Sequence, residues 1–300
     1  SLYANAQSVQ VYGGEDAATP DYGKVYISIR AKSGSNLTEL TKNDLVKSLK
    51  SFAVASVTPV IIDPETTFIT LETTFKYDSS LTTKDVSTLQ TNVLNAVSSY
   101  NTSTLEDFTG MFRYSEVLKT IDDADSSILS NITKVKMYKF ITPTLNSALK
   151  YTVSFNNAFY NPHSGHNSSA GGVVSSTGFK INNDSSTNEH FLDDDGAGNI
   201  RVYYLSGTTR IYTSESFGTI NYSTGEIILT SANITSISNV DGAASTRIRV
   251  TVTPDSNDII PVRNQTLEID TSNSSFTGSV DEIESGSSQA GTGYTTTSSY

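Results

Sequence analysis

The chain has 300 residues, a hydrophobic fraction of 36% and no cysteine, so it can hold two or three domains but no disulfide or thiolate metal site. Its formal net charge of -11 argues against partners such as nucleic acid or anionic lipid, which bind clustered lysine and arginine. The sequence contains no apolar run long enough to span a bilayer, and its first residues lack the regions of a signal peptide. We therefore expect a soluble protein with no membrane partner.

The first predicted elements follow a lead-in loop, 1–23. Within 24–30, Val25, Ile27 and Ile29 alternate with polar residues, which predicts a half-buried strand. Thr41 is the expected N-cap of the helix that comes next. The apolar residues at helical spacing in this helix are Leu45, Val46, Leu49, Phe52 and Ala53.

The pattern then continues with alternating strands and helices. We expect a strand over 66–77, helices over 83–100 and 111–121, and a strand over 131–141. Helices over one face of a small sheet are typical of α+β proteins. Residues 24–146 are therefore predicted to form an α+β domain with a mixed α/β layer.

The pattern changes at about residue 147. Short stretches such as "IRVYYL" and "GEIILT" alternate with turns rich in Gly, Asn, Asp and Ser, which predicts an all-β domain over 147–270. A sandwich-like fold and an irregular barrel are both compatible with these strands. We interpret 156–180 as an exposed loop, and the composition of 271–300 predicts an extended or disordered tail.

Two short motifs have the residue types of metal or phosphate sites. "GGED", residues 13–16, is similar to the hairpin of cyclic-dinucleotide cyclases, but Ala17 and Ala18 follow it and a long loop comes before the next strand. A turn that requires glycine is the better interpretation. His163 and His166, with His190 further along, could bind zinc, but a solvated loop is favoured because the neighbours are Asn, Ser and Gly.

A third motif, "DDDGAGN" over 193–199, has the acids and central glycine of a calcium loop but lacks the terminal glutamate of an EF-hand. We predict a β-turn there. No nucleophile elbow, phosphate-binding loop or serine-histidine-aspartate set is evident in the sequence. The residues therefore indicate no enzyme, no catalytic residue, no metal site and no cofactor.

Two segments at opposite ends of the chain resemble one protein family. "VYGGEDAATPDYGKVYISIR", residues 11–30, and "TVTPDSNDIIPVRNQTLEI", residues 251–269, are similar to the baseplate wedge subunit (J-like baseplate protein) of T-even-like contractile-tailed bacteriophages. The resemblance implies the C-terminal part of that subunit, in keeping with a chain that starts at Ser1 rather than Met.

The resemblance also implies a function. It implies a non-catalytic structural protein of the virion tail baseplate, assembled in the host cytoplasm. Its implied partners are itself, in dimer contacts around a ring, and other wedge proteins, and the ring around the central hub rearranges when the tail contracts.

We select contact residues from the two resembling segments, because an apolar pair, a proline and an arginine among polar residues can anchor a partner. They are Tyr12, Gly13, Gly14, Glu15, Asp16, Asn257, Asp258, Ile259, Ile260, Pro261 and Arg263. The alternative for Ile259 and Ile260 is that they cover the core of their own domain.

A carbohydrate-binding or adhesin-like β module is the alternative function. The tyrosine-rich strands and the Asn/Asp loops favour it. Tyr203 and Tyr204 are adjacent on a predicted strand, so they face opposite sides and cannot form one sugar-stacking platform. A metal-dependent hydrolase that uses the three histidines is a weaker alternative.

Overall fold

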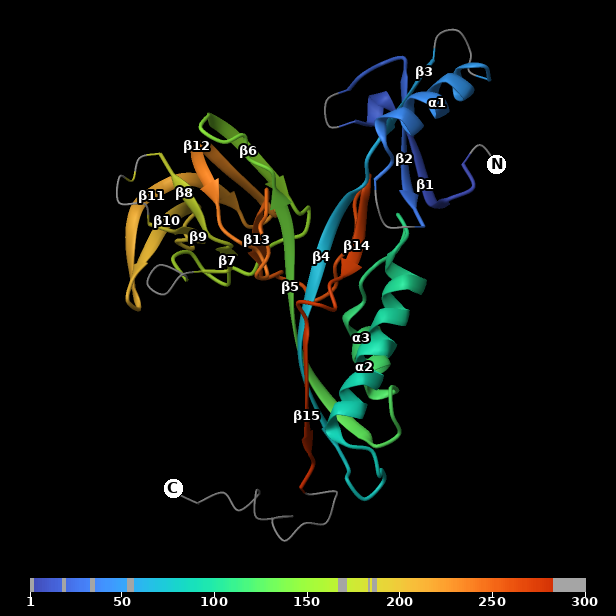
Figure 1. Cartoon of the computed structure of the whole chain (residues 1–300), viewed down its shortest axis with the longest axis vertical. Helices are drawn as coiled ribbons and strands as arrows, with labels where there is room; N and C mark the ends of the chain where they lie inside the picture. The colour runs from blue at the N-terminus through green and yellow to red at the C-terminus, as the bar shows by residue number, and fades with distance from the viewer. Residues whose placement is uncertain are drawn as a thin grey trace. The chain divides into compact units, whose positions relative to one another are not determined.

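The computed structural model describes residues 3–17, 20–32, 36–52, 57–166, 172–182, 184 and 188–282 (Figure 1). The fold is mainly β. No helix among these residues has the length and apolar character needed to cross a membrane. The chain folds as two compact units. Unit 1 comprises Ser1–Thr67, Ser98–Phe112 and Ile260–Ile269, and unit 2 comprises Phe68–Val97, Arg113–Ile259 and Asp270–Tyr300.

Unit 1 is built on a sheet of order β1-β2-β3. Its strands are β1 (Ala6–Gly13), β2 (Lys24–Ala31) and β3 (Thr58–Ile62), with β1 antiparallel and β3 parallel to β2. One face carries Ile27 and Ile29 of the predicted strand. This face packs with Leu37 and with Leu45 of helix α1 (Glu39–Lys50). The alternation within 24–30 therefore marks a core face, as predicted.

Helix α1 begins and ends earlier than predicted. Its N-cap is Thr38, whose hydroxyl accepts a hydrogen bond from the amide of Thr41, so Thr41 lies inside the first turn. The prediction of Thr41 as N-cap is wrong because two threonines stand three residues apart, and the earlier one closes the turn. The helix ends at Lys50, which leaves Phe52 80% exposed rather than on the core face, and Ala53 lies outside the described residues.

The other face of this sheet contacts two distant segments of the same unit. One segment contains the end of helix α2 (Val86–Tyr100) and a π-helical turn, Asn101–Leu105. The other contains strand β14 (Gln265–Ile269). The side-chain oxygen of Asn101 accepts a hydrogen bond from the amide of Ile269 at 2.7 Å, which joins the two segments.

Unit 2 contains a sheet in which β4 and β5 are the central pair. Its strands are β4 (Glu65–Tyr77, from Phe68 onward in this unit), β5 (Ile128–Ile141), β13 (Ile248–Val252), β7 (Val174–Ser176) and β15 (Ser275–Val280). Helices α2 and α3 (Tyr114–Asp122) lie beside β4 and β5 (Figure 1). Strands β4 and β5 and helices α2 and α3 match predicted elements within a few residues. The prediction of an exposed loop over 156–180 is wrong in part, because β7 lies in that segment and Val174 and Phe179 are buried. The stripe of Leu89, Val93 and Val97 on α2 is fully buried, as its helical spacing predicts.

Part of the predicted tail is a strand of this sheet. Strand β15 runs parallel to β4, with Gly278 opposite Phe75. A Cβ atom on Gly278 would lie 2.7 Å from the Phe75 ring, so only glycine lets the two strands approach here. Composition alone missed β15 because most of its side chains are small and polar and it is bound through its backbone. Residues 283–300 of the predicted tail lie outside the described residues.

The remaining strands of unit 2 form a separate, barrel-like sheet. They are β6 (Ala148–Ser154), β8 (Phe179–Ile181), β9 (His190–Asp194), β10 (Asn199–Ser206), β11 (Thr209–Asn221) and β12 (Glu226–Ile237). The order is β11-β10-β9-β8-β12-β6, and β11 also pairs with β12, so the strands from β8 to β12 close a ring. Of the two folds compatible with the sequence, this pairing corresponds to the irregular barrel rather than to stacked sheets.

Strands from each predicted domain enter more than one sheet. The predicted α+β region, 24–146, contributes β2 and β3 to the sheet of unit 1 and β5 to the sheet of unit 2. The predicted all-β region, 147–270, contributes β7 and β13 to the sheet of β5 in addition to the barrel-like ring. Strand pairing between residues far apart in sequence determines this arrangement, and local patterns do not show it.

Candidate functional site

The "GGED" motif forms a shaped turn between β1 and β2. Gly14, Glu15 and Asp16 make a short 3-10 turn, and the carbonyl of Gly14 accepts hydrogen bonds from the amides of Ala17 and Asp21. A Cβ atom on Gly14 would lie 1.9 Å from the carbonyl oxygen of Asp21, so a side chain cannot fit. The glycine therefore serves the close approach of two backbone segments.

Two predicted contact segments meet at this turn. The ring of Tyr12 stacks on that of Tyr26 with centroids 5.5 Å apart, and the guanidinium of Arg263 lies 5.9 Å from the Tyr12 ring. Arg263 also pairs with Asp16 at 3.5 Å, with both side chains about half exposed. Burial and the neighbouring Tyr26 raise the pKa of Tyr12, so its hydroxyl stays protonated at neutral pH. We call Tyr12, Glu15, Asp16, Ile260, Pro261, Val262 and Arg263 the hairpin surface.

Apolar side chains are exposed on and beside the hairpin surface. Ile260 is 48% exposed and Val262 is 41% exposed, next to Arg263 in the chain. On the opposite face of edge strand β1, Val9 and Val11 are 51% and 58% exposed. An arginine and aliphatic side chains at a polar rim are the composition expected of a protein contact. Unit 1 thus presents exposed apolar side chains at the hairpin surface and on edge strand β1.

The structure assigns Asn257, Asp258 and Ile259 to unit 2, whereas the hairpin surface belongs to unit 1. The carboxylate of Asp258 accepts hydrogen bonds from the amide of Tyr114 and from Arg113, both at 2.9 Å, at the start of α3. The Tyr114 amide and the Arg113 guanidinium lower the pKa of Asp258. Asp258 therefore caps a helix of its own unit, while Asn257 is exposed.

Ile259 and Ile260 divide between the two roles considered for them. Ile259 is fully buried, so it covers the core of its own unit, as the alternative interpretation held. Ile260, the next residue, begins a segment of unit 1 and is half exposed. A residue in an extended segment points to the opposite side from its neighbour, which explains why the two differ.

The three histidines do not come together. His163 and His166 lie in one exposed loop, with Nε2 of the first 3.2 Å from Nδ1 of the second. His190 lies in β9, fully buried, 3.2 Å from a carboxylate oxygen of Asp184. Burial lowers the pKa of His190, which is therefore neutral at neutral pH. Among the residues that the structure describes, no group of three or more His, Cys, Asp or Glu side chains could hold a metal ion.

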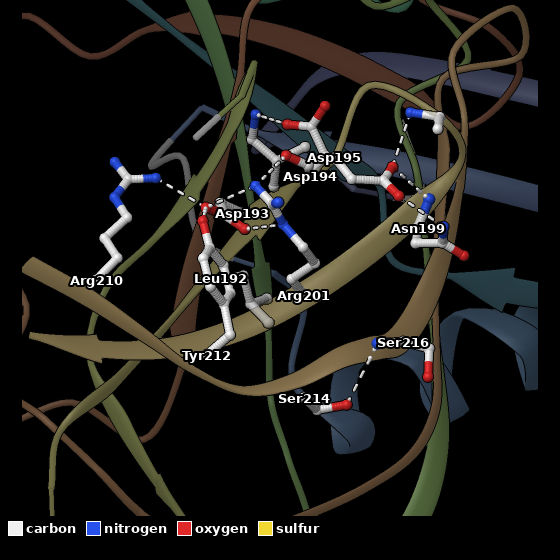
Figure 2. A network of polar contacts seen from close by, with 12 residues as sticks. Leu192, Asp193, Asp194, Asp195, Asn199, Arg201, Arg210, Tyr212, Ser214 and Ser216 are labelled. Atoms are coloured by element: carbon white, nitrogen blue, oxygen red, sulfur yellow. Dashed lines mark hydrogen bonds and ion pairs between the residues drawn. The ribbon is translucent and has the colours of Figure 1, made fainter. Parts of the chain in front are cut away.

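The "DDDGAGN" motif combines a turn with an ionic cluster. Asp195 accepts hydrogen bonds from the amides of Ala197 and Asn199 at 2.7 and 2.9 Å, so its side chain closes the loop between β9 and β10. The predicted β-turn over 193–199 starts too early, because strand β9 extends to Asp194. The two preceding aspartates are buried in strand β9. Figure 2 shows Asp193 pointing toward Arg201 of β10 and Arg210 of β11.

The cluster at Asp193 satisfies a buried charge from several sides. Arg201 donates to both carboxylate oxygens, from Nε at 2.9 Å and from Nη2 at 3.2 Å, and Arg210 donates at 2.8 Å (Figure 2). The hydroxyl of Tyr212 donates at 2.9 Å, and its ring lies 4.4 Å beneath the Arg201 guanidinium. Sequence reasoning missed this cluster. The only available signal was an aspartate at a predicted turn and two arginines in the predicted strands that follow it.

The tyrosines considered for sugar binding belong to the interior or to separate faces. Tyr203 is 9% exposed and packs near the rings of Phe191 and Tyr212, while Tyr204 lies near the ring of His190. A stacking platform needs an exposed ring, and Tyr203 does not provide one. These two residues therefore give the carbohydrate alternative no support.

Comparisons with known proteins bear on both ends of the predicted α+β region. Residues 1–62 match the family model of baseplate structural protein gp6, C-terminal domain I, and residues 65–140 match that of its C-terminal domain III. The baseplate wedge protein gp6 of Enterobacteria phage T4 is 28% identical over 148 residues, which cover 48% of this chain and 22% of that protein. The match thus spans less than a quarter of that relative. These findings confirm the predicted resemblance to the C-terminal part of a baseplate wedge protein.

Proposed function

We propose that this chain is a structural subunit of a phage tail baseplate wedge, located in the virion and assembled in the host cytoplasm. The observation that carries the proposal is the succession of two matches, to C-terminal domains I and III of one baseplate protein, over residues 1–140. The similarity to baseplate proteins supports a structural role in the baseplate and a location there. The role is non-catalytic, in keeping with the structural proteins that the chain matches.

In this proposal the subunit associates with itself and with other wedge proteins in a ring around the central hub, and the ring rearranges on contraction. The hairpin surface is the contact that we assign to self-association. Its exposed Ile260 and Val262 offer apolar area, and Arg263 with Asp16 offers a charge of each sign. A two-fold contact requires a self-complementary patch, and a patch with both signs of charge meets that requirement.

Sedimentation velocity over a hundredfold range of concentration tests self-association. We expect the sedimentation coefficient of the full chain to rise with concentration. The double variant Ile260→Ser with Arg263→Asp is expected to raise the dissociation constant by about tenfold or more, because it removes an apolar contact and reverses a charge at the patch.

A matched double variant on α1, Leu40→Ser with Lys47→Asp, makes the same kinds of change at exposed positions of the same unit. Its dissociation constant should stay within about twofold of the wild-type value, since surface changes away from a contact have small effects. A sedimentation coefficient that stays at the value of a monomer over the whole concentration range would contradict self-association of this chain. Equal losses in both double variants would contradict the hairpin surface.

A further inference from the structure

The sheet formed by β15, β4 and β5 has one covered face and one open face. On β4, the side chains of Ile69, Leu71 and Phe75 point to one side and are fully buried, whereas Glu72 and Thr74 point to the other side and are exposed. Buried residues of α2 and α3 lie with the first side, and the hydroxyl of Tyr114 on α3 donates to the carbonyl of Thr133 on β5. The second side is open to solvent.

On the open face, the pairing of β4 with β5 and β15 aligns side chains from the three strands in rows. Thr74 lies opposite Ile132 on β5 and opposite Thr277 on β15, and the row before it pairs Glu72 with Lys134. We call this surface the lysine face. Its members are Glu72, Thr74, Lys76, Ile132, Lys134, Lys136, Ser275, Thr277 and Ser279.

The charge of the lysine face is opposite to that of the chain. It carries three lysines and one glutamate, whereas the whole chain has 20 basic and 31 acidic residues. Lys136 donates to Glu72 at 2.6 Å, and this bond, with a contribution from Lys134, lowers the pKa of Glu72. The single carboxylate is therefore ionised and already neutralised, and the face keeps a net positive charge at neutral pH.

An apolar side chain lies in the middle of this charged surface. Ile132 is 74% exposed, and it lines a shallow hollow of about 260 Å³ with Thr74, Lys134, Ser275 and Thr277 among its other walls. An exposed isoleucine ringed by hydroxyl groups and lysines has the arrangement of a contact centre, in which an apolar anchor is surrounded by polar residues. A phosphate backbone gains nothing from such an anchor, and the face offers neither arginine nor an aromatic ring for bases.

We propose that the lysine face docks an acidic polypeptide segment of a partner protein, with an apolar side chain of that segment on Ile132 and its carboxylates on Lys76 and Lys134. The inference rests on the proposed assembly role for the presence of a partner, but its chemistry follows from the face itself. A net charge of -11 repels an acidic segment elsewhere on the chain, so attraction at this face would also orient the partner.

Binding of a labelled peptide of alternating glutamate and valine to the full chain tests the proposal by fluorescence anisotropy at low salt. We expect saturable binding that weakens as salt rises, and much weaker binding of the matching glutamine-valine peptide. The double variant Lys76→Glu with Lys134→Glu is expected to weaken binding by at least about tenfold, and Ile132→Ser by about fivefold, because charge and anchor are lost separately.

The matched control is Lys47→Glu with Lys50→Glu on α1. It changes the net charge by the same amount but lies in unit 1, whereas the lysine face belongs to unit 2. Its affinity for the peptide should stay within about twofold of the wild-type value. Equal weakening in both double variants, or no binding of the acidic peptide, would overturn the proposal. So would tighter binding of a single-stranded oligonucleotide that Lys76→Glu with Lys134→Glu abolishes, since the face would then serve phosphate.

The two proposals fail separately. The lysine-face variants are expected to leave the sedimentation behaviour of the chain unchanged, because the hairpin surface lies in the other unit. If the wild-type chain binds the peptide but does not self-associate, only the proposed contact at the hairpin surface is contradicted. Circular dichroism of each variant checks folding, and all four substituted positions of the two lysine variants are exposed.

Discussion

The two units contain buried ionic clusters that are assembled in opposite ways. In unit 2, Asp193 binds Arg201, Arg210 and Tyr212, all within 19 residues of it along the chain. In unit 1, Arg30 binds Thr266 and Glu268, more than 230 residues away. The first cluster closes between neighbouring antiparallel strands, and the second holds distant segments of the chain together. The same kind of contact therefore forms between residues close together in the sequence and between residues far apart in it.

The clusters also differ in how completely their charges are satisfied. Both oxygens of Asp193 accept hydrogen bonds, from two arginines and a tyrosine. Arg30 donates from both terminal nitrogens, but its Nε has no hydrogen-bond partner among the described residues. The carboxylate partners of Arg30 are also partly exposed, Glu268 by 33% and Glu106 by 20%. The local cluster should therefore contribute more to stability than the long-range one.

Unit 1 requires segments from three parts of the chain. Residues 1–62 match one family domain, yet Arg30 of that domain contacts residues of the segments 98–112 and 260–269. Asn101 joins these two segments to each other through its hydrogen bond with Ile269. The sheet of unit 1 is therefore stabilised by segments that come much later in the sequence than its own strands. We therefore expect the hairpin surface to reach its folded conformation only when β14 has packed in unit 1.

The largest expected effect is that of Asp193→Asn. Removal of this charge leaves Arg201, whose side chain is 9% exposed, without its carboxylate partner. Loss of one member of a buried ion pair typically destabilises a protein by several kcal/mol, so we expect the free energy of unfolding to fall by about 3 kcal/mol. Urea denaturation followed by circular dichroism measures the change.

Glu215→Gln is the matched control, because Glu215 is exposed on β11 of the same barrel-like sheet. It should change the free energy of unfolding by less than about 0.5 kcal/mol. If Asp193→Asn had an equally small effect, the cluster would not stabilise the barrel-like sheet, and the comparison with Arg30 would lose its basis.

Arg30→Met is expected to have a smaller effect, a loss of about 1 to 2 kcal/mol in the free energy of unfolding. Methionine replaces the apolar stem of the side chain without its guanidinium, and the partly exposed Glu268 and Glu106 can bind water once the guanidinium is gone. Urea denaturation measures this loss under the conditions used for Asp193→Asn.

Lys32→Met, two residues along at an exposed position, controls for the change from a cation to methionine. It should leave the free energy of unfolding within about 0.5 kcal/mol of the wild-type value. A larger loss for Arg30→Met than for Asp193→Asn would reverse the order argued above, and the long-range cluster would then be the stronger one.

The same contrast explains how much the sequence could predict. Periods of two and of 3.6 residues located β2, β4, β5, α2 and α3, because each buries one face along its own length. The partners of these elements could not be located this way. The antiparallel pairing of β13 with β5 and the parallel pairing of β15 with β4 join residues more than 100 positions apart, and no local pattern encodes them.

The contact residues were predictable only in part for a related reason. The sequence could single out Tyr12 and Arg263 but could not show that they meet. It also grouped Asp258 and Ile259 with Ile260, although the first caps α3 and the second lies in a core. Whether an apolar or charged side chain turns inward depends on which element packs against it, and that is a tertiary property.

The smallest expected effect separates burial from hydrogen bonding. Asp125 has a 6% exposed side chain and bonds to Lys84, which is about half exposed. The Lys84 ammonium is the main cause that lowers the pKa of Asp125 from 3.8 to about 2. Because the folded-state pKa is depressed, the stabilisation is fully present above the unfolded pKa and is lost as the pH falls through about 2.

Asp125→Asn should therefore lower the free energy of unfolding by about 1 kcal/mol at neutral pH, a small amount because solvent screens the lysine. The difference from the wild type should stay constant down to about pH 5, shrink below the unfolded pKa of 3.8 and vanish only below the folded pKa of about 2, as urea denaturation at each pH would show. The exposed Asp123, which pairs with Lys119, provides Asp123→Asn as the control, with a smaller effect at every pH. A loss at Asp125 as large as that at Asp193 would mean that hydrogen bonding to the carboxylate, rather than burial of both partners, sets the strength of these clusters.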